Sequence, residues 1–417
     1  MIQYKKLVRL FLALLILFPV VSFSQNNTSS PYSKFGAGDL SNVAYGRNLA
    51  LGGTGYALRG SSFLNLKNPA SLTAIDTLST LYETGVFAKF TQNTSNELSR
   101  YSTDGNITHL ALGHRYTPWL MGNYGIMPFS DIGYNFKTFT SVEGELGTVV
   151  TDWKGTGGIS KLFYGLGLKV TKNLSLGADI AYYFGPINEQ RKTTAMVEVD
   201  NPTSMYINTR YSGLSYKGAF QYSANLGEKG TNLVIGGVFS PAQRFYGNST
   251  VTIQQSYNST AVVQAYSKES SVDPIKIPMT IGGGASFTWR GLYLLTADYE
   301  LASWSVDNTR EYIDQSIYSF GLERLPQSQL NYWQRCSYRA GFRYDSGYFK
   351  VKGYAVDDMR LSVGMGFPIK KTRSTINVTM EAGQRGTTSM GLLRERYSKM
   401  TVAFSFHDFW FVKRKID

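Results

Sequence analysis

The chain has 417 residues, with 42 Lys and Arg against 29 Asp and Glu, one cysteine and three histidines. A single cysteine cannot form an intramolecular disulfide, and these counts exclude a disulfide scaffold and a cysteine-based zinc module. Because 42% of the residues are hydrophobic, the chain is too apolar for a disordered protein and is expected to fold.

The first residues have the pattern of a secretory signal peptide. Three basic residues among the first nine precede an apolar run over residues 10–23. This run is shorter than the roughly 20 residues that a membrane-spanning helix needs. Small residues end it and suit cleavage after Ser24, so residues 1–24 are predicted to be a cleaved signal peptide. An uncleaved anchor helix is the alternative.

The next segment, residues 25–78, is rich in Ser, Gly and Asn and shows no sustained alternation of apolar and polar residues. Its glycine cluster at residues 51–60 lacks the Lys-Ser/Thr pair of a phosphate-binding loop and the third glycine of a dinucleotide motif. Nucleotide binding is therefore not expected. Small residues and glycine allow close approach of the backbone, which fits a segment packed inside another structure.

From residue 79 onward, stretches of about ten residues alternate large apolar with small or polar side chains, which predicts strands. Within residues 292–301, Tyr293, Leu295 and Tyr299 share one face, while Thr296 lies on the other. Further strands are predicted at residues 338–344, 361–367, 376–382 and 400–406, and less regularly at 107–116, 162–170, 176–184, 220–226 and 281–289.

A soluble β-sandwich and a transmembrane barrel both fit alternating strands. No later window approaches a membrane-spanning helix, only 17% of the residues are charged, and glycine is common. Aromatic residues gather near the predicted strand ends, as in the girdles of membrane barrels. These features favour an all-β fold, a transmembrane antiparallel β-barrel in the cell outer membrane. Counting the alternating segments gives twelve to sixteen strands, and we expect a barrel of about 14 strands.

The connections of the barrel are expected to differ at its two ends. Short turns, such as those at Lys172, Lys229 and Arg290, are predicted to face the periplasm. The longer polar stretches are predicted to be extracellular, at residues 93–104, 186–212, 247–273, 306–331 and 384–395.

Two short motifs carry a family resemblance. Asn68, Pro69 and Ala70 follow the glycine-rich segment just before the first predicted strand, and a Pro-Phe element lies in residues 125–131. This arrangement resembles the FadL/OmpP1/TodX family of outer-membrane barrels. The resemblance implies that residues 25–78 form an N-terminal hatch that plugs the lumen. Residues 30–39 and 409–417 are similar to Bacteroidota members of the group.

The same resemblance implies that Gly125, Pro128 and Phe129 lie where the third strand is kinked and a lateral opening can form. Proline lacks a backbone donor and fits poorly inside a central strand, and an ordinary bulge is the alternative. The barrel is expected to span residues 79–411. A basic C-terminal tail follows at residues 412–417, either as a solvated end or as a binding element.

Charged residues on the small-residue face of the strands are expected to point into the lumen. Opposite charges there can pair across the barrel or hold the plug, because desolvated charges need partners. A path for a specific ion or solute is the alternative. The predicted lumen charges are Asp179, Asp298, Glu300, Arg339, Arg343 and Glu381.

The resemblance implies passive uptake of small hydrophobic molecules through the plugged lumen, with lateral release into the membrane. The alternative is a non-transporting subunit of an outer-membrane secretion or barrel-assembly complex. An apolar cavity beside the hatch would favour transport, whereas a closed lumen and a flat outer face would favour docking. The expected partners are outer-membrane lipid and lipopolysaccharide, with a hydrophobic ligand or complex-forming proteins under the two hypotheses.

Catalysis is not expected, because His109 and His114 fall on opposite strand faces and His407 points away from its neighbour Asp408. No cofactor and no metal site is predicted. The net charge of +13 suits lipopolysaccharide phosphates and is not taken to indicate nucleic acid.

Overall fold

The computed structural model describes residues 28–41, 44–96, 98–141, 148–195, 202–227, 229–257, 261–306, 312–327, 331–370 and 372–409. The predicted signal peptide at 1–24 and the basic tail at 412–417 lie outside these ranges. Within them, no helix has the length and hydropathy needed to cross a membrane.

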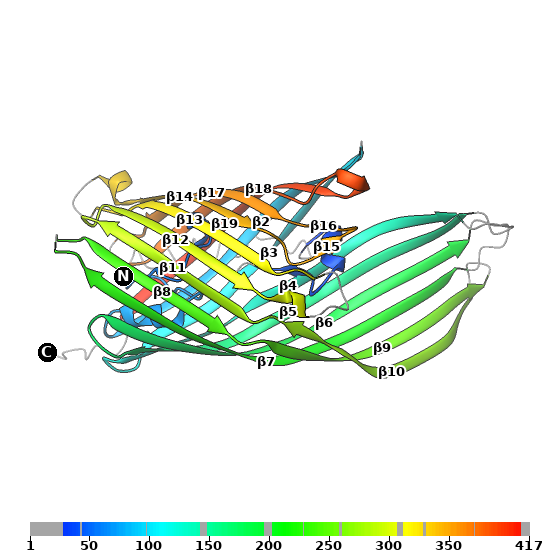
Figure 1. Ribbon diagram of the computed structural model, residues 1–417, viewed down its shortest axis with the longest axis horizontal. Coiled ribbons are helices and arrows are strands. Elements are labelled where there is room, and N and C mark those ends of the chain that lie inside the picture. Colours follow the sequence, from blue (N-terminus) through cyan, green and yellow to red (C-terminus); the bar gives the residue numbers. More distant parts are fainter. Residues whose placement is uncertain are drawn as a thin grey trace, which may run out of the picture.

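Antiparallel strands form one closed barrel, in which the last strand pairs with the first (Figure 1). Each strand pairs with its sequence neighbours, so the order around the wall follows the chain. The wall strands are β2 (Ser79–Ser95), β3 (Leu98–Arg115), β4 (Leu120–Ser141), β5 (Thr148–Lys169), β6 (Leu174–Ala195), β7 (Thr203–Asn225), β8 (Asn232–Ser240), β9 (Gln243–Tyr257), β10 (Ala261–Ile277), β11 (Thr280–Trp289), β12 (Tyr293–Ala302), β13 (Gln315–Arg324), β14 (Ser337–Asp345), β17 (Asp358–Pro368), β18 (Thr375–Arg385) and β19 (Arg394–Phe409).

Two of the wall positions are occupied by interrupted strands. β8 and β9 both pair with β7, and β11 and β10 pair with them in turn. Pro241 separates β8 from β9, and Pro278 separates β10 from β11, because proline cannot donate to a ladder. Counted by position, the wall has 14 strands, which confirms the predicted barrel. The soluble sandwich is excluded, because the sheet closes on itself.

Side chains alternate across the wall as the sequence predicts. On β12, Tyr293, Leu295 and Tyr299 point outward and are 44%, 55% and 42% exposed. Thr296 and Asp298, between them, are buried. Most wall strands expose large apolar side chains in the same way, so the exterior suits hydrocarbon better than water.

The wall is uneven. β5, β6 and β7 have 22 or 23 residues, whereas β12, β13 and β14 have 9 or 10. The outer parts of β4–β7, β9 and β10 therefore extend beyond the rest of the rim as a projecting sheet, seen at the right of Figure 1.

This sheet corrects the loop prediction. Residues 186–212 and 247–273 are mainly strand, because strands with polar faces continue above the apolar band. Residues 306–331 contain β13, which is part of the wall.

The N-terminal segment lies against the inner face of the barrel (Figure 1). It contains the 3-10 helices η1 (Pro31–Lys34), η2 (Leu49–Leu51) and η3 (Pro69–Ala74) and the short strand β1 (Asp39–Leu40). The other short elements lie in connections: η4 (Trp304–Val306), η5 (Tyr332–Arg335), β15 (Lys350–Val351), β16 (Tyr354–Ala355) and η6 (Ser389–Gly391).

Glycine allows this close approach. Gly52 has a φ of +69°, and a Cβ added to Gly341 of β14 would lie 2.0 Å from the Gly52 nitrogen. The two glycines therefore let the segment seat directly on the wall.

Candidate functional site

The third wall strand separates from the second partway along its length. β3 has 18 residues and β4 has 22, yet only residues 110–115 and 121–126 pair with each other. Beyond that point β3 continues on β2 and β4 continues on β5. Among the described residues, the facing edges at 98–109 and 127–141 thus make no ladder with each other.

Proline and a bulge mark the separation. Pro128 has no N–H to donate, and the register of β4 with β5 shifts between Pro128 and Ser130, which leaves Phe129 unpaired. β3 has its own register shift opposite Gly85 and Val86 of β2. Gly125 lies just before the separation, in register with Ala111, where a Cβ would approach the Leu110 carbonyl oxygen to 2.3 Å.

The start of the N-terminal segment contacts both separated edges. On the β3 side, Ser29 Oγ donates to Asp104 Oδ1 at 2.6 Å. On the β4 side, β1 pairs with Ser130 and Asp131, and the Ser41 N–H donates to the Phe129 carbonyl at 2.8 Å. Residues 29–41 therefore bridge the gap in the wall.

An ion pair fixes β1 at this place. Arg385 Nη1 on β18 donates to Asp39 Oδ1 at 2.9 Å, and Thr28 Oγ1 donates to Oδ2 at 3.2 Å. Burial is the largest single influence and would raise the pKa of the Asp39 carboxyl. The positive charges of Arg385 and Lys89, together with the hydrogen bonds from Thr28 and Arg385, outweigh it and hold this pKa below its usual value.

Behind the gap lies an aromatic cluster. The Phe129 ring centroid is 4.9 Å from that of Tyr183 and 6.0 Å from that of Phe245, and these two stack at 4.5 Å. Phe245 and Tyr183 are buried. The unpaired residue of the bulge thus packs its side chain inward.

A cavity of about 370 Å³ adjoins this cluster, between the N-terminal segment and the wall. Pro128, Phe129 and Ile277 give it an apolar part. The rest is lined by charged side chains, including Lys161, Lys217, Glu300, Arg343, Arg360 and Lys399. The cavity is therefore amphipathic rather than uniformly apolar.

Two of the predicted lumen charges bind the N-terminal segment directly. Asp298 Oδ2 accepts hydrogen bonds from the backbone N–H groups of Gly55 and Tyr56, at 2.7 and 3.1 Å, and from Lys67 Nζ at 3.2 Å. Glu300 accepts a hydrogen bond from the Tyr56 hydroxyl at 2.5 Å and lies 3.7 Å from Lys67 Nζ.

The other four lumen charges also point inward. Arg339 Nε donates to Glu323 at 2.9 Å, and Glu323 also binds Arg47 Nε of the N-terminal segment at 2.7 Å. Asp179 lies within 3.5–3.7 Å of Lys217 and Lys161. The remaining pairs join wall residues, Arg343 with Asp345 at 3.8 Å and Glu381 with Arg360 and Lys399 at 3.7 Å.

The predicted hatch motif has a local structural role. Asn68 Oδ1 accepts a hydrogen bond from the Ala70 N–H at 2.9 Å and so caps η3, with Pro69 in the first turn. Asn68 Nδ2 donates to the carbonyls of Tyr56 and Phe220, at 2.7 and 3.1 Å. The motif thereby joins the N-terminal segment to β7.

Some anchoring residues are missed by sequence reasoning. Gln221 Nε2 on β7 donates to the Tyr56 and Leu58 carbonyls, at 2.9 and 3.1 Å. Glu83 on β2 accepts hydrogen bonds from the Leu64 N–H at 3.1 Å and from Ser405 Oγ on β19 at 2.6 Å. The alternation of their strands could have shown that Gln221 and Glu83 point inward. Their partners Tyr56, Leu58 and Leu64 could not be predicted, because they lie in a segment without a periodic pattern.

The model of the BamG family matches residues 2–417. Among solved structures, the CymD monoaromatic hydrocarbon channel is 13% identical, with a TM-score of 0.60 over 88% of this chain and 97% of that one. The P. putida toluene transporter TodX is 14% identical, with a TM-score of 0.61 over 89% and 100%. A Pseudomonas aeruginosa FadL homologue is 11% identical, with a TM-score of 0.58 over 89% and 98%. No curated protein matches the sequence.

At these identities the likeness shows the fold. It agrees with the predicted resemblance to FadL-like barrels as regards architecture.

Proposed function

The chain belongs to the BamG family, and from this premise and the bridged gap in its wall we propose an outer-membrane barrel that passes small hydrophobic molecules sideways into the membrane. Residues 28–78 serve as the plug of this barrel. Residues 1–24 are removed as a signal peptide on export. Outer-membrane lipid and lipopolysaccharide surround the apolar wall.

The observation that carries the proposal is the β3–β4 gap beside the cavity. The apolar side of the cavity, at Pro128 and Phe129, borders the place where the wall ladder ends. Residues 29–41 rather than a wall strand bridge the gap there. Each such hydrogen bond contributes only about 0.5–1.5 kcal/mol net, so local release of this segment requires far less than barrel unfolding.

The solved structures support the same use of the fold. CymD is a channel for monoaromatic hydrocarbons, and TodX is a toluene transporter. By analogy, a hydrophobic molecule enters the lumen, rests against the aromatic cluster and leaves between β3 and β4.

A reversible tether across the gap tests the proposal. Leu40 of β1 and Ser130 of β4 are register partners, so cysteines at both positions in a Cys336→Ser background can form a disulfide. The probe is the hydrophobic dye 1-N-phenylnaphthylamine, whose uptake into cells is followed by fluorescence. Oxidation is expected to reduce uptake at least fivefold, and reduction to restore it.

The matched control places cysteines at Tyr182 and Leu214, which are outward register partners on β6 and β7. Oxidation of this pair leaves dye uptake unchanged if the gap is the exit. Equal uptake by the oxidised and reduced forms of the Leu40–Ser130 pair rejects lateral passage.

A second candidate function is a non-transporting subunit of an outer-membrane secretion or barrel-assembly complex. The charged lining of the cavity favours it, because a hydrophobic ligand gains little from such a surface. The projecting sheet also favours it, because residues 135–141 of β4 form an exposed edge on which a partner strand can pair.

Gentle detergent purification with mass spectrometry separates the two functions. A stoichiometric hydrophobic ligand without protein partners supports transport. A stoichiometric set of proteins without such a ligand supports the subunit role.

A further inference from the structure

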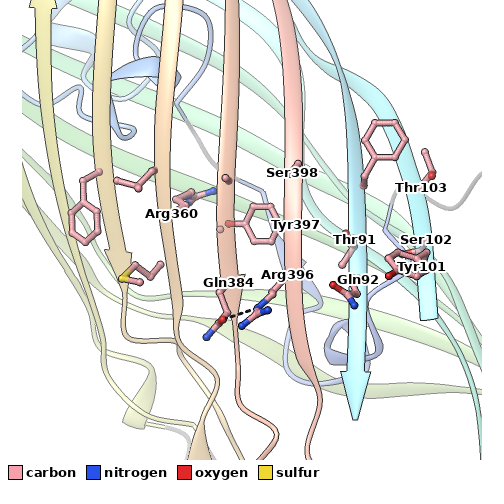
Figure 2. Close-up of a pocket in the computed structure, with 16 residues that line it drawn as sticks. Thr91, Gln92, Tyr101, Ser102, Thr103, Arg360, Gln384, Arg396, Tyr397 and Ser398 are labelled. Atoms are coloured by element: carbon pink, nitrogen blue, oxygen red, sulfur yellow. Dashed lines mark hydrogen bonds between the residues drawn. The ribbon is translucent and has the colours of Figure 1, made fainter. Parts of the chain in front are cut away.

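A groove of about 610 Å³ crosses the outer face of β17, β18, β19 and β2 and reaches Phe342 of β14 at one side and Tyr101 and Thr103 of β3 at the other (Figure 2). In one cross-strand row, Leu361, Ala382, Ser398 and Phe90 are successive register partners. The two central side chains are small, whereas Leu361 and Phe90 are 62% and 58% exposed. The small pair forms the floor of the groove, and the two large side chains form its walls.

The next row toward the rim is polar. Gln384, Arg396 and Gln92 are register partners there, and Arg396 Nε donates to Gln384 Oε1 at 3.2 Å. Figure 2 shows these side chains together at one end of the groove.

A second cation stands beside this row. Arg394 lies two residues before Arg396 on β19 and therefore on the same face. Its buried Nε has no hydrogen-bond partner among the described residues. No Asp or Glu is among the residues that line the groove. An anionic group at the polar row therefore meets Arg396 within the groove, with Arg394 two residues nearer the rim on the same strand face.

The height of the polar row matches a lipid headgroup. Gln92 and Arg396 lie within three residues of the ends of β2 and β19, next to the β2–β3 and β18–β19 connections. The short turns assigned to the periplasm lie at the opposite end of the strands, so this rim belongs to the outer leaflet.

We propose that the groove binds one phosphorylated lipid of the outer leaflet. Its phosphate lies at Arg394 and Arg396, where planar guanidinium groups donate paired hydrogen bonds, and an acyl chain lies over Ala382 and Ser398. The proposal rests on the outer-membrane location but not on transport, since the groove is centred on β18 and β19 and only its end reaches the β3 edge of the gap, at Tyr101 and Thr103.

Native mass spectrometry of the full-length protein tests this site, with diphosphoryl lipid A and its dephosphorylated form as probes. We expect one tightly bound phosphorylated molecule per barrel and at least tenfold weaker binding of the dephosphorylated one. Arg396→Gln is expected to weaken binding by about tenfold or more, as the loss of a charge-assisted hydrogen bond implies. Ala382→Leu, which fills the floor of the groove, has an effect in the same direction.

The control variants make the same changes elsewhere on the outer face. Arg210→Gln on β7 and Ala178→Leu on β6 alter exposed, outward residues far from the groove in wall order. Lipid binding by these variants equals that of the unmodified protein if the site is specific. Folding of every variant is checked by heat-modifiable gel migration.

Three outcomes overturn the proposal. The first is equal binding by all four variants, which means annular lipid only. The second is displacement of the lipid by inorganic phosphate, which means a soluble-anion site. The third is an unchanged affinity for the dephosphorylated form. The Leu40–Ser130 tether leaves the groove intact, so loss of dye uptake and loss of lipid binding are separate results.

Discussion

Asp298 is a main anchor of the N-terminal segment on the wall. It is buried, and three donors of the N-terminal segment converge on one of its oxygens. Its inward position could be predicted from the alternation in β12, because alternate side chains of a strand point to the same face of the sheet. Its partners could not be predicted, because Gly55, Tyr56 and Lys67 lie in a segment without a periodic pattern.

Asp298→Ala is expected to loosen the N-terminal segment, because it leaves the buried Lys67 charge with one weaker ion-pair partner, Glu300, and the Gly53 carbonyl. Breaking a buried ion pair costs about 3–5 kcal/mol. The measurement is the rate of limited proteolysis within residues 28–78, which should rise at least tenfold. Asp152→Ala removes an exposed pair with Lys137 and is the control, expected to have no effect. Unchanged cleavage in Asp298→Ala would show that this anchor is dispensable.

Gly341 gives a steric test of the contact between the N-terminal segment and the wall. Gly341→Ala places a Cβ 2.0 Å from the Gly52 nitrogen, so η2 must shift. Overpacking of this kind typically costs about 1–3 kcal/mol, and the expected result is faster proteolysis of the N-terminal segment. Gly218→Ala is the control, because nothing lies within 4 Å of a Cβ there. Equal cleavage rates in the two variants would show that the N-terminal segment does not pack against the wall at Gly341.

At the scale of elements, the strands were predictable and their extents were not. Alternation with a period of two located strands such as β12, β14 and β18. It could not show that β6, β7, β9 and β10 continue as the projecting sheet, since strands above an apolar band carry polar residues on both faces and resemble loops in sequence. Pro241 and Pro278 are local signs of an interruption, but the sequence does not show that the strands on either side share one wall position, because that depends on pairing between distant segments.

The β1 element should leave the wall in acid. The pKa of Asp39 in the folded protein lies below its value of about 3.9 in an unfolded chain. Its contribution is therefore fully present above that value and is lost as the pH falls through the folded pKa. The measurement is pepsin cleavage within residues 28–41 between about pH 5 and pH 2, normalised to an unfolded substrate.

Arg385→Gln should move the onset of this cleavage to higher pH, because the largest of the charges that lower the Asp39 pKa is gone. If cleavage begins at the same pH in Arg385→Gln and in the unmodified protein, the Asp39–Arg385 ion pair does not hold β1 in place.

At the scale of the molecule, composition predicted a closed barrel and the alternating segments bounded its strand number, whereas the separation of β3 from β4 was implied only by the family resemblance. Among the residues themselves only Pro128 hinted at the separation, and a proline is equally compatible with a simple bulge. The bridging of the gap by residues 29–41 joins positions far apart in sequence, such as Ser29 with Asp104, and no local pattern encodes such contacts.

Two deletions should separate sideways passage from flow through the lumen. Removal of residues 28–41 unbridges the gap but keeps the Asp298 anchor, so dye uptake should rise without stepwise ion conductance in planar bilayers. Removal of residues 28–78 takes away the whole plug and should produce conductance steps. Conductance in the shorter deletion would mean that residues 28–41, rather than the anchored part, close the lumen.

Glu83 implies an order of biogenesis. Glu83 belongs to β2, the first wall strand. Its carboxylate accepts hydrogen bonds from Leu64 of the N-terminal segment and from Ser405 of β19, the last wall strand. The seam of the barrel is thus made by segments at opposite ends of the chain, and the contact between them includes the plug. If β19 paired with β2 before the N-terminal segment was in place, the Glu83 carboxylate would be buried without the hydrogen bond from the Leu64 N–H. We therefore expect the N-terminal segment to be in place before β19 pairs with β2 and closes the barrel.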